Sequence, residues 1–153
     1  MRHEISIAKI ATAILIILTL ISIARADERV DAILKPYRLA PKGLSEIIIE
    51  AGKKYNIDPS IIAAIIVTES SANPKAVSKG GDYGLMQIRW KVHRRSYPQL
   101  KTATDLFNPR TNVFIGTEIF ARYYAQKKTL RGALLRYSGG NTNMANKVIK
   151  ELR

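Results

Sequence analysis

The stretch that decides the fold is Pro59-Ser60-Ile61-Ile62-Ala63-Ala64-Ile65-Ile66-Val67-Thr68-Glu69-Ser70. Residues 61–67 are apolar on every side, which places this segment at the centre of a domain. Periodicity alone allows either a buried strand or a buried helix. The alanine pair favours a helix, and so does Asp58, an N-cap residue followed by proline at the first helical position. The sequence therefore predicts a buried helix whose last turn carries a carboxylate, Glu69.

Further helix signals lie on both sides of this segment. They are helical spacing of apolar residues, as in 44–55, a cap-and-proline start at Asn108-Pro109, and a capping residue at Thr129. Between the predicted helices lies a connection of 35 residues, 73–107, rich in Gly, Pro, Ser and Lys. So long a connection is usually functional or holds small elements of its own. The expected fold class is mainly α: a compact helical domain with one long active-site loop that can hold a small β-element. Besides 59–70, the predicted helices cover 44–55, 110–126, 130–137 after Thr129, and 143–152.

The first 26 residues have the pattern of a secretory signal peptide. A basic start is followed by the apolar stretch 10–24 and by the small-x-small sequence Ala24-Arg25-Ala26. The stretch is short for a permanent anchor, which needs roughly 20 apolar residues. We expect cleavage after Ala26, a lead-in over 27–43 and one domain over 44–153. An uncleaved anchor is the alternative, and both place the domain outside the cytoplasm, in the periplasm or cell envelope.

The amino-acid composition limits the kinds of functional site and partner that the protein can have. The 153 residues include no cysteine and two histidines, His3 and His93. This excludes a disulfide scaffold, a thiolate metal site and a cysteine nucleophile, and it leads us to expect no metal or cofactor. The formal net charge of +13 favours polyanions such as nucleic acid, anionic lipid or an acidic cell-wall polymer. Because the basic residues are scattered and the chain carries an export signal, we expect no nucleic-acid partner.

Glu69 is the candidate catalytic residue. It stands at the edge of the predicted core, where partial desolvation raises the pKa of a carboxylic acid. The negative end of the helix dipole acts in the same direction. A glutamic acid kept protonated near neutrality is what glycosidic bond cleavage needs to protonate the leaving oxygen. From position alone, an ordinary exposed Glu at a helix end remains the alternative.

The sequence after Glu69 carries a recognisable series of fragments. Residue types and intervals resemble the soluble lytic transglycosylase (SLT) catalytic domain, a branch of the goose-type lysozyme-like superfamily, over about residues 44–150. Ser78 lies nine positions after Glu69 and Gln87 eighteen, as the family pattern requires. The fragments are Glu69-Ser70, Asn73-Pro74-Lys75-Ala76, Gly80-Gly81, Gly84-Leu85-Met86-Gln87-Ile88, Asn108-Pro109 with Asn112 and Gly116, and Arg136-Tyr137-Ser138-Gly139-Gly140.

One fragment departs from the family pattern. The family usually has Ala-Tyr-Asn followed by a spaced glycine, whereas this chain has Arg136-Tyr137-Ser138 with Gly140 in the glycine position. Serine keeps a hydroxyl donor and acceptor but lacks the reach of the amide. We therefore expect the contact that the family's Asn makes to be lost or taken over by Asn141.

The resemblance implies an α+β lysozyme-like fold and cleavage of the β-1,4 bond between N-acetylmuramic acid and N-acetylglucosamine in peptidoglycan. It implies 1,6-anhydromuramic ends, because the C6 hydroxyl of the substrate replaces water, and Glu69 as the sole acid and base. We expect Trp90 either to stack on a sugar or to pack in the core. Each of three implied site residues also has a purely structural interpretation: Met86 as a core residue, Ser78 as a loop residue and Tyr137 as an aromatic packing residue. The implied substrate-binding residues are Ser78, Gly84, Leu85, Met86, Gln87, Tyr137 and Ser138.

The implied partner is the peptidoglycan glycan strand. Small secreted domains of this type often accompany a secretion, conjugation or pilus apparatus, and a membrane contact is expected only if the signal segment is retained. Three alternatives remain open at this point. The first is lysozyme-type hydrolysis of the same bond with Asp82 positioning a water, the second a non-catalytic glycan-binding envelope module, and the third an exported DNA-binding protein.

Overall fold

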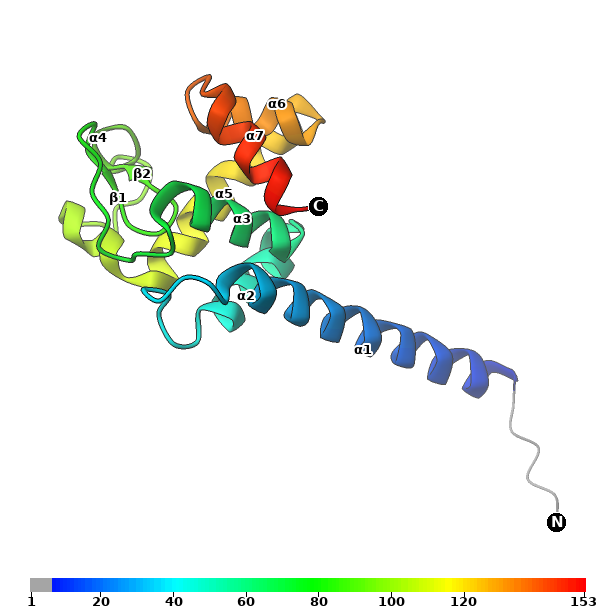
Figure 1. The fold of residues 1–153 in the computed structure, drawn as a ribbon. Coiled ribbons are helices and arrows are strands. Elements are labelled where there is room, and N and C mark those ends of the chain that lie inside the picture. Colours follow the sequence, from blue (N-terminus) through cyan, green and yellow to red (C-terminus); the bar gives the residue numbers. More distant parts are fainter. Residues whose placement is uncertain (1–6) are drawn as a thin grey trace, which may run out of the picture.

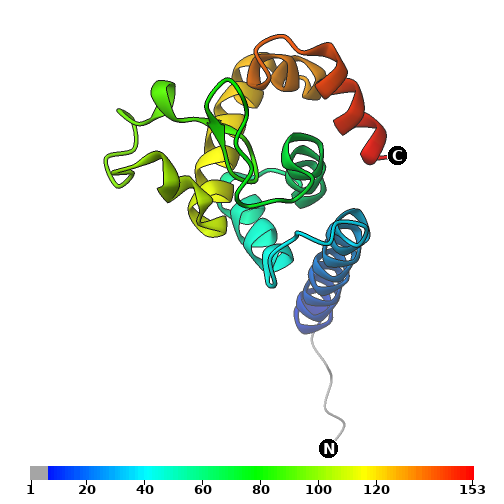
Figure 2. The same ribbon diagram turned by 60° about the vertical axis from the view of Figure 1, so that its left-hand side comes forward.

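The computed structural model describes residues 7–153, so Arg2 and His3 lie outside the described residues. The fold is mainly helical, and its only described sheet has two strands of two residues each (Figure 1). Helix α3 occupies the centre and packs against α1, α2 and α7, while α5 packs against both α2 and α6. In Figure 2, α5, α6 and α7 curve around α3. The elements are α1 (Ile7–Leu34), α2 (Leu44–Tyr55), α3 (Pro59–Ser70), β1 (Asp82–Tyr83), β2 (Ile88–Arg89), α4 (Trp90–His93), the 3-10 helix η1 (Ala103–Phe107), α5 (Pro109–Lys127), α6 (Leu130–Tyr137) and α7 (Thr142–Glu151).

Helix α3 has the bounds and the burial that its sequence predicts. Residues 62–67 are all buried, and together they form the middle of the hydrophobic core. The side chain of Asp58 caps the helix by accepting a hydrogen bond from the Ser60 backbone N–H at 2.9 Å. Ser71 ends the helix in the left-handed conformation with φ 52°. Glu69 therefore stands two residues beyond a fully buried segment.

The other predicted helices are confirmed within two residues at each end. Asn108 caps α5 through its side chain, which accepts from the Thr111 N–H, and Thr129 does the same for α6 through the Gly132 N–H. Helix α7 begins one residue earlier than predicted. The reason is Asn141, whose side chain accepts from the Met144 N–H at 3.1 Å and so caps the helix at that point.

The long segment between α3 and α5 folds around a small antiparallel hairpin of β1 and β2, as expected for a loop with elements of its own. In this hairpin Asp82 stands opposite Arg89. The buried side chain of Asn112 on α5 holds the segment in place. Its Oδ1 accepts from the Met86 N–H at 2.8 Å, and its Nδ2 donates to the carbonyl oxygens of Tyr83 at 2.8 Å and Leu106 at 2.7 Å.

Glycine is required where this segment meets α5. Gly84 has φ 76°, in the left-handed region that favours glycine. A Cβ added there would lie 2.2 Å from Nδ2 of Asn112 and 2.3 Å from the carbonyl oxygen of Leu106. On α5 itself, a Cβ at Gly116 would lie 2.5 Å from Sδ of Met86. The two glycines let the loop backbone and the Met86 side chain lie directly against the helix.

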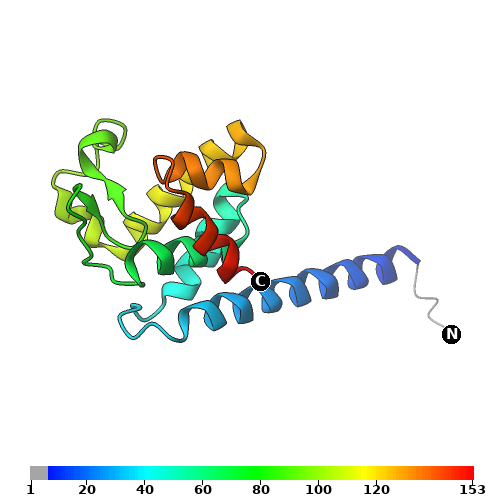
Figure 3. The same cartoon turned by 45° about the horizontal axis from the view of Figure 1, so that its top comes forward.

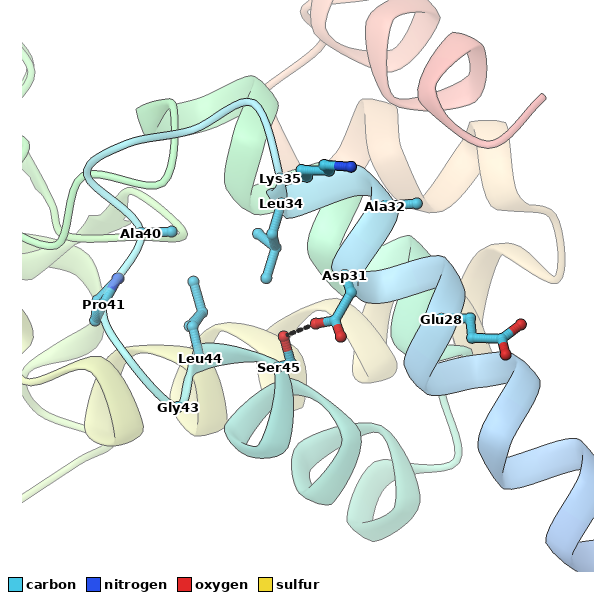
Figure 4. Close-up of a pocket in the computed structure, with 10 residues that line it drawn as sticks. All are labelled: Glu28, Asp31, Ala32, Leu34, Lys35, Ala40, Pro41, Gly43, Leu44 and Ser45. Carbon is cyan, nitrogen blue, oxygen red and sulfur yellow. Dashed lines mark hydrogen bonds between the residues drawn. The ribbon is translucent and has the colours of Figure 1, made fainter.

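Helix α1 is one continuous element that passes through the predicted cleavage position at Ala26. Its last turns belong to the domain, because Val30 and Leu34 are buried against it. Asp31 there accepts a hydrogen bond from the Ser45 hydroxyl on α2 (Figure 4). Figure 3 shows the rest of α1 extending away from the domain, and its large apolar side chains over 10–21 are exposed. By length and composition it could cross a membrane, a test that a signal sequence also passes.

Candidate active site

A cleft of about 680 Å³ opens between the end of α3, the β1–β2 hairpin, α5 and the α6–α7 turn. Its walls bring together residues that are far apart in the sequence. Four of the predicted site residues line it, namely Glu69, Gln87, Tyr137 and Ser138. The other residues that line it are Asp82, Ile88, Arg89, Val92, His93, Ile119, Tyr123, Arg136, Gly139 and Asn141.

The Glu69 carboxyl is the one acid in the cleft with a raised pKa. Burial, and then the negative charge of Asp82, raise its pKa to about 7. Among residues 7–153, none donates a hydrogen bond to it, so nothing offsets the cost of desolvation. The next residue, Ser70, fixes its position: the Ser70 hydroxyl lies 2.8 Å from the carbonyl oxygen of Leu85 and 3.0 Å from that of Ile66. About half of the Glu69 carboxyls are therefore protonated at neutral pH.

The pKa of Asp82, in contrast to that of Glu69, is lowered. Arg89 donates to both of its oxygens, Nε to Oδ1 at 2.7 Å and Nη2 to Oδ2 at 3.0 Å, and the Ser78 hydroxyl donates to Oδ2 at 2.7 Å. Burial would raise the pKa of Asp82, but the hydrogen bonds from Arg89 and Ser78 outweigh it and hold the pKa below its usual value. Asp82 is therefore a paired, ionised neighbour of Glu69 rather than a second proton donor.

Gln87 sits in the cleft wall in an uncommon backbone conformation, with φ 48°. Non-glycine residues in the left-handed region usually need local support. Here the side-chain Nε2 donates to the carbonyl oxygens of Gly84 at 2.9 Å and Ala76 at 3.2 Å. Its Oε1 accepts no hydrogen bond from the described residues, and it remains available to a ligand in the cleft.

Tyr137 lies beside Glu69 but is hydrogen-bonded elsewhere. Its hydroxyl donates to the carbonyl oxygen of Met86 at 2.8 Å, and its ring packs edge-to-face on Phe120 with centroids 6.0 Å apart. Burial, and then the nearby charge of Glu69, raise the pKa of Tyr137 well above its usual value. Tyr137 thus stays neutral and ties α6 to the loop.

Ser138 stabilises the turn after α6. Its hydroxyl accepts from the Asn141 N–H at 3.1 Å and lies 3.3 Å from the carbonyl oxygen of Asn141. The turn contains Gly139 and Gly140, both at positive φ. The serine that replaces the family's Asn is therefore engaged within its own turn, and the Asn141 side-chain oxygen is used to cap α7.

The structure does not bring the other predicted substrate-binding residues into the cleft lining. Leu85 and Met86 are 0% exposed and belong to the core, and neither lines the cleft, so their part in substrate binding stays a prediction. Gly84 is buried against Asn112. The Ser78 hydroxyl is turned to Asp82 and also accepts from the backbone N–H groups of residues 80 and 82.

Several cleft residues were not found from the sequence. Arg89, Tyr123 and Arg136 line the cleft. Nothing in the local pattern marks Arg89 or Tyr123, and Arg136, although it lies in a family fragment, stands where the family has Ala and was given no role. The signal that could have found Arg89 is the hairpin register, which places it opposite Asp82. Trp90, expected either to stack on a sugar or to pack, packs against the core and is partly buried. Within residues 7–153 no group of three or more His, Cys, Asp or Glu gathers in an arrangement that could hold a metal ion.

Comparison with known proteins agrees with this geometry. The family model described as "Transglycosylase SLT domain" matches residues 46–151. The chain is 34% identical over 101 residues to the transglycosylase of Enterobacteria phage PRD1, covering 66% of this chain and 36% of the relative. It is also 34% identical over 96 residues to the membrane-bound lytic murein transglycosylase E of Buchnera aphidicola subsp. Acyrthosiphon pisum (strain APS), covering 57% and 41%.

A solved structure is similar as well. The 70 kDa soluble lytic transglycosylase from Escherichia coli superposes with a TM-score of 0.59 at 26% identity, covering 79% of this chain and 20% of that one. This confirms the predicted mainly α, lysozyme-like fold. The chain spans less than half the length of each of these relatives. Because the family match covers most of its length, the chain belongs to the transglycosylase SLT domain family.

Proposed function

We propose that this protein is a peptidoglycan lytic transglycosylase that cleaves the β-1,4 bond between N-acetylmuramic acid and N-acetylglucosamine and leaves 1,6-anhydromuramic ends. The observation that carries the proposal is the Glu69 carboxyl, which lies in the cleft without a hydrogen-bond donor and has a pKa of about 7. A general acid works best when its pKa lies near the operating pH. Family membership supplies the substrate class, and the relatives named above are transglycosylases, one of them a murein transglycosylase.

Glu69 performs two proton transfers in this mechanism. Protonated Glu69 first donates its proton to the glycosidic oxygen, so that the bond to the muramic C1 breaks and the N-acetylglucosamine leaves as an alcohol. The Glu69 carboxylate then takes the proton of the muramic C6 hydroxyl, whose oxygen forms a bond to C1 and closes the anhydro ring. The group ends as it began, protonated, and a pKa near 7 makes both states accessible.

The state of Asp82 favours this reaction over hydrolysis. An inverting hydrolase needs a second carboxylate free to activate water. Both oxygens of Asp82 already accept hydrogen bonds from Arg89, and Oδ2 accepts another from Ser78. Asp82 is therefore poorly suited to position water, and the substrate's own hydroxyl becomes the better nucleophile.

Product chemistry tests the proposal. The full chain is incubated with purified peptidoglycan, and the product ends are identified by mass spectrometry, with Glu69→Gln as the matched control. Anhydromuramic ends that vanish in the control support the proposal. Reducing ends would make the protein a lysozyme-type hydrolase. Binding to peptidoglycan without cleavage would make it a non-catalytic glycan-binding module.

The Asp82–Arg89 pair should modulate the pH dependence of the reaction. Burial is the main cause of the raised pKa of Glu69, and the charge of Asp82 adds to it. Asp82→Asn removes that second contribution, so the alkaline limb of the pH–activity profile should move to lower pH, on the order of half a unit. Arg89→Gln leaves the charge of Asp82 unpaired and should move the limb to higher pH. Turbidity clearing of peptidoglycan between pH 5 and 9 measures both. Shifts in the same direction would contradict an electrostatic role for the pair.

We further propose that the protein acts in the cell envelope, with peptidoglycan strands as its partner. The apolar N-terminal helix supports this, as does the similarity to a relative described as membrane-bound. Cleavage after Ala26, a periplasmic location and service to a secretion, conjugation or pilus apparatus are parts of the same proposal. N-terminal sequencing of the protein recovered from cells tests the cleavage position.

The folded unit should begin near Asp27 rather than at Leu44. Deleting residues 1–26 should leave the urea midpoint of unfolding unchanged, because the buried side chains of Val30 and Leu34 remain. Deleting residues 1–34 should cost at least about 2 kcal/mol, since each buried aliphatic side chain contributes roughly 1.5–3 kcal/mol. Equal midpoints for the two deletions would show that the last turns of α1 contribute nothing to the domain.

A further inference from the structure

The cleft has three basic side chains, and they differ in how their charge is balanced. Arg89 is paired with Asp82 through two hydrogen bonds. Burial, and then the positive charge of Arg122, lower the pKa of His93, which is therefore neutral at pH 7. Arg136 has no carboxylate within 4.0 Å among the described residues. The positive charge of Arg136 is thus the one in the described cleft that no protein group balances.

Arg136 is also held in a defined place. Its guanidinium carbon lies 5.5 Å from the centroid of the Tyr123 ring, and both residues line the cleft. The next residue, Tyr137, is fixed by its hydrogen bond to Met86. A guanidinium that lies against an aromatic face keeps its N–H edge free, and that planar edge matches the two oxygens of a carboxylate. The site is therefore cationic, oriented and open to a ligand.

We infer that Arg136 binds a carboxylate carried by the muramic acid residue of the glycan strand. This inference rests on the proposed function and deepens it. The alternating sugars of the strand are otherwise neutral, and their carboxylates lie on the muramic lactyl arm, either free or extended by the stem peptide. An anion entering this cleft meets Asp82 and the Glu69 carboxyl, both of which repel it when ionised. Arg136 offsets that repulsion and gives the cleft a preference for muramic strands over neutral glycans.

Binding measurements distinguish specific carboxylate binding by Arg136 from an effect of the protein's net charge. The full chain carrying Glu69→Gln leaves the ligand uncut, and isothermal titration calorimetry in a neutral detergent gives Kd. Three ligands of matched length are compared: a peptide-bearing glycan fragment, the same fragment after an amidase has removed its peptides, and a chitin oligosaccharide, which has no carboxylate. Arg136→Gln is compared with Arg131→Gln, which lies on the same helix and loses the same charge but contacts exposed Asn146 outside the cleft.

Arg136→Gln should raise Kd for muramic ligands about tenfold, equivalent to about 1.4 kcal/mol. Chitin binding should not change, and Arg131→Gln should change none of the three values. Arg136→Lys should fall between wild type and Arg136→Gln, because lysine keeps the charge but loses the planar fork. In the peptide-bearing fragment the lactyl carboxyl is an amide, so a loss confined to that fragment identifies a stem-peptide carboxylate. A loss confined to the peptide-free fragment identifies the lactyl carboxylate, and a loss on both shows that Arg136 binds either one.

Other outcomes overturn the inference. An equal loss in Arg131→Gln would show a long-range effect of net charge. A matching loss on chitin would show that Arg136 supports the cleft structurally or contacts the neutral sugars. If the wild-type chain neither binds nor cuts peptidoglycan, the proposed function fails and the inference fails with it. If the wild type cuts peptidoglycan and Arg136→Gln binds it equally well, only the inference fails.

Discussion

A Glu69→Gln chain is expected to lose peptidoglycan cleavage by about 10³-fold or more, since general acid–base catalysis alone contributes roughly 10²–10⁴-fold and Glu69 is proposed to act in both proton transfers. Gln has nearly the same shape but can neither donate the proton at neutral pH nor accept one. Release of soluble anhydromuropeptides, followed over time, measures the loss. A variant that clears peptidoglycan as fast as wild type would overturn the catalytic assignment.

The same substitution should stabilise the fold at alkaline pH. The pKa of Glu69 is about 7 in the folded protein and near 4.5 when unfolded, so between these values the folded state binds more protons and wild-type stability falls as pH rises. Above pH 8 the Gln variant should be more stable by up to about 3 kcal/mol, while near pH 4 this difference should disappear. Urea unfolding at both pH values provides the test, and a gap independent of pH would contradict it.

Asn112→Ala is expected to cost about 3–5 kcal/mol of unfolding free energy and to abolish activity. It leaves the Met86 N–H and the carbonyl oxygens of Tyr83 and Leu106 without their partner. Each buried polar group left unsatisfied costs roughly 1–3 kcal/mol. These backbone groups belong to the segment that carries the β1–β2 hairpin. Without Asn112 this segment should move away from α5, and the wall of the cleft that it forms should be lost.

Asn108→Ala is the matched control for this change. Asn108 lies four residues earlier and caps α5 from an exposed position, where loss of the cap costs about 1 kcal/mol. Urea unfolding of the two variants compares a buried amide with an exposed one on the same helix. If Asn112→Ala lowered the free energy of unfolding no more than Asn108→Ala, the loop would not depend on the side-chain amide of Asn112.

The helices were predictable because their ends are chemically marked. Asp58-Pro59, Asn108-Pro109 and Thr129 each supply the acceptor that a helix start needs, and the structure uses all three side chains as caps. The buried interior of α3 follows from the apolar run over 61–67. Helix α5 is one residue longer than predicted at each end, and α7 begins one residue early because Asn141 caps it. Asn141 had instead been considered as a substitute for a missing site residue.

The cleft was predictable in part, because motif spacing shows which residues belong to a site but not which way they face. Glu69 and Gln87 line the cleft as expected, whereas Leu85 and Met86 are turned inward. The cause lies in contacts with α5, where Asn112 binds the loop backbone and Gly116 makes room for Met86. Such long-range contacts leave no local pattern. Arg136 precedes Tyr137 in a family fragment, but it stands where the family has Ala, so the resemblance gave it no role.

A pKa near 7 gives the protein an asymmetric response to its surroundings. At pH 7 about half of the Glu69 carboxyls hold the proton. Acidification by one unit can raise that fraction only about twofold, to nearly all molecules, whereas alkalinisation by one unit lowers it about fivefold, to roughly one molecule in eleven. In the proposed mechanism the protonated form starts the reaction, so mild acid would raise activity at most about twofold, while a rise of one pH unit would remove most of it.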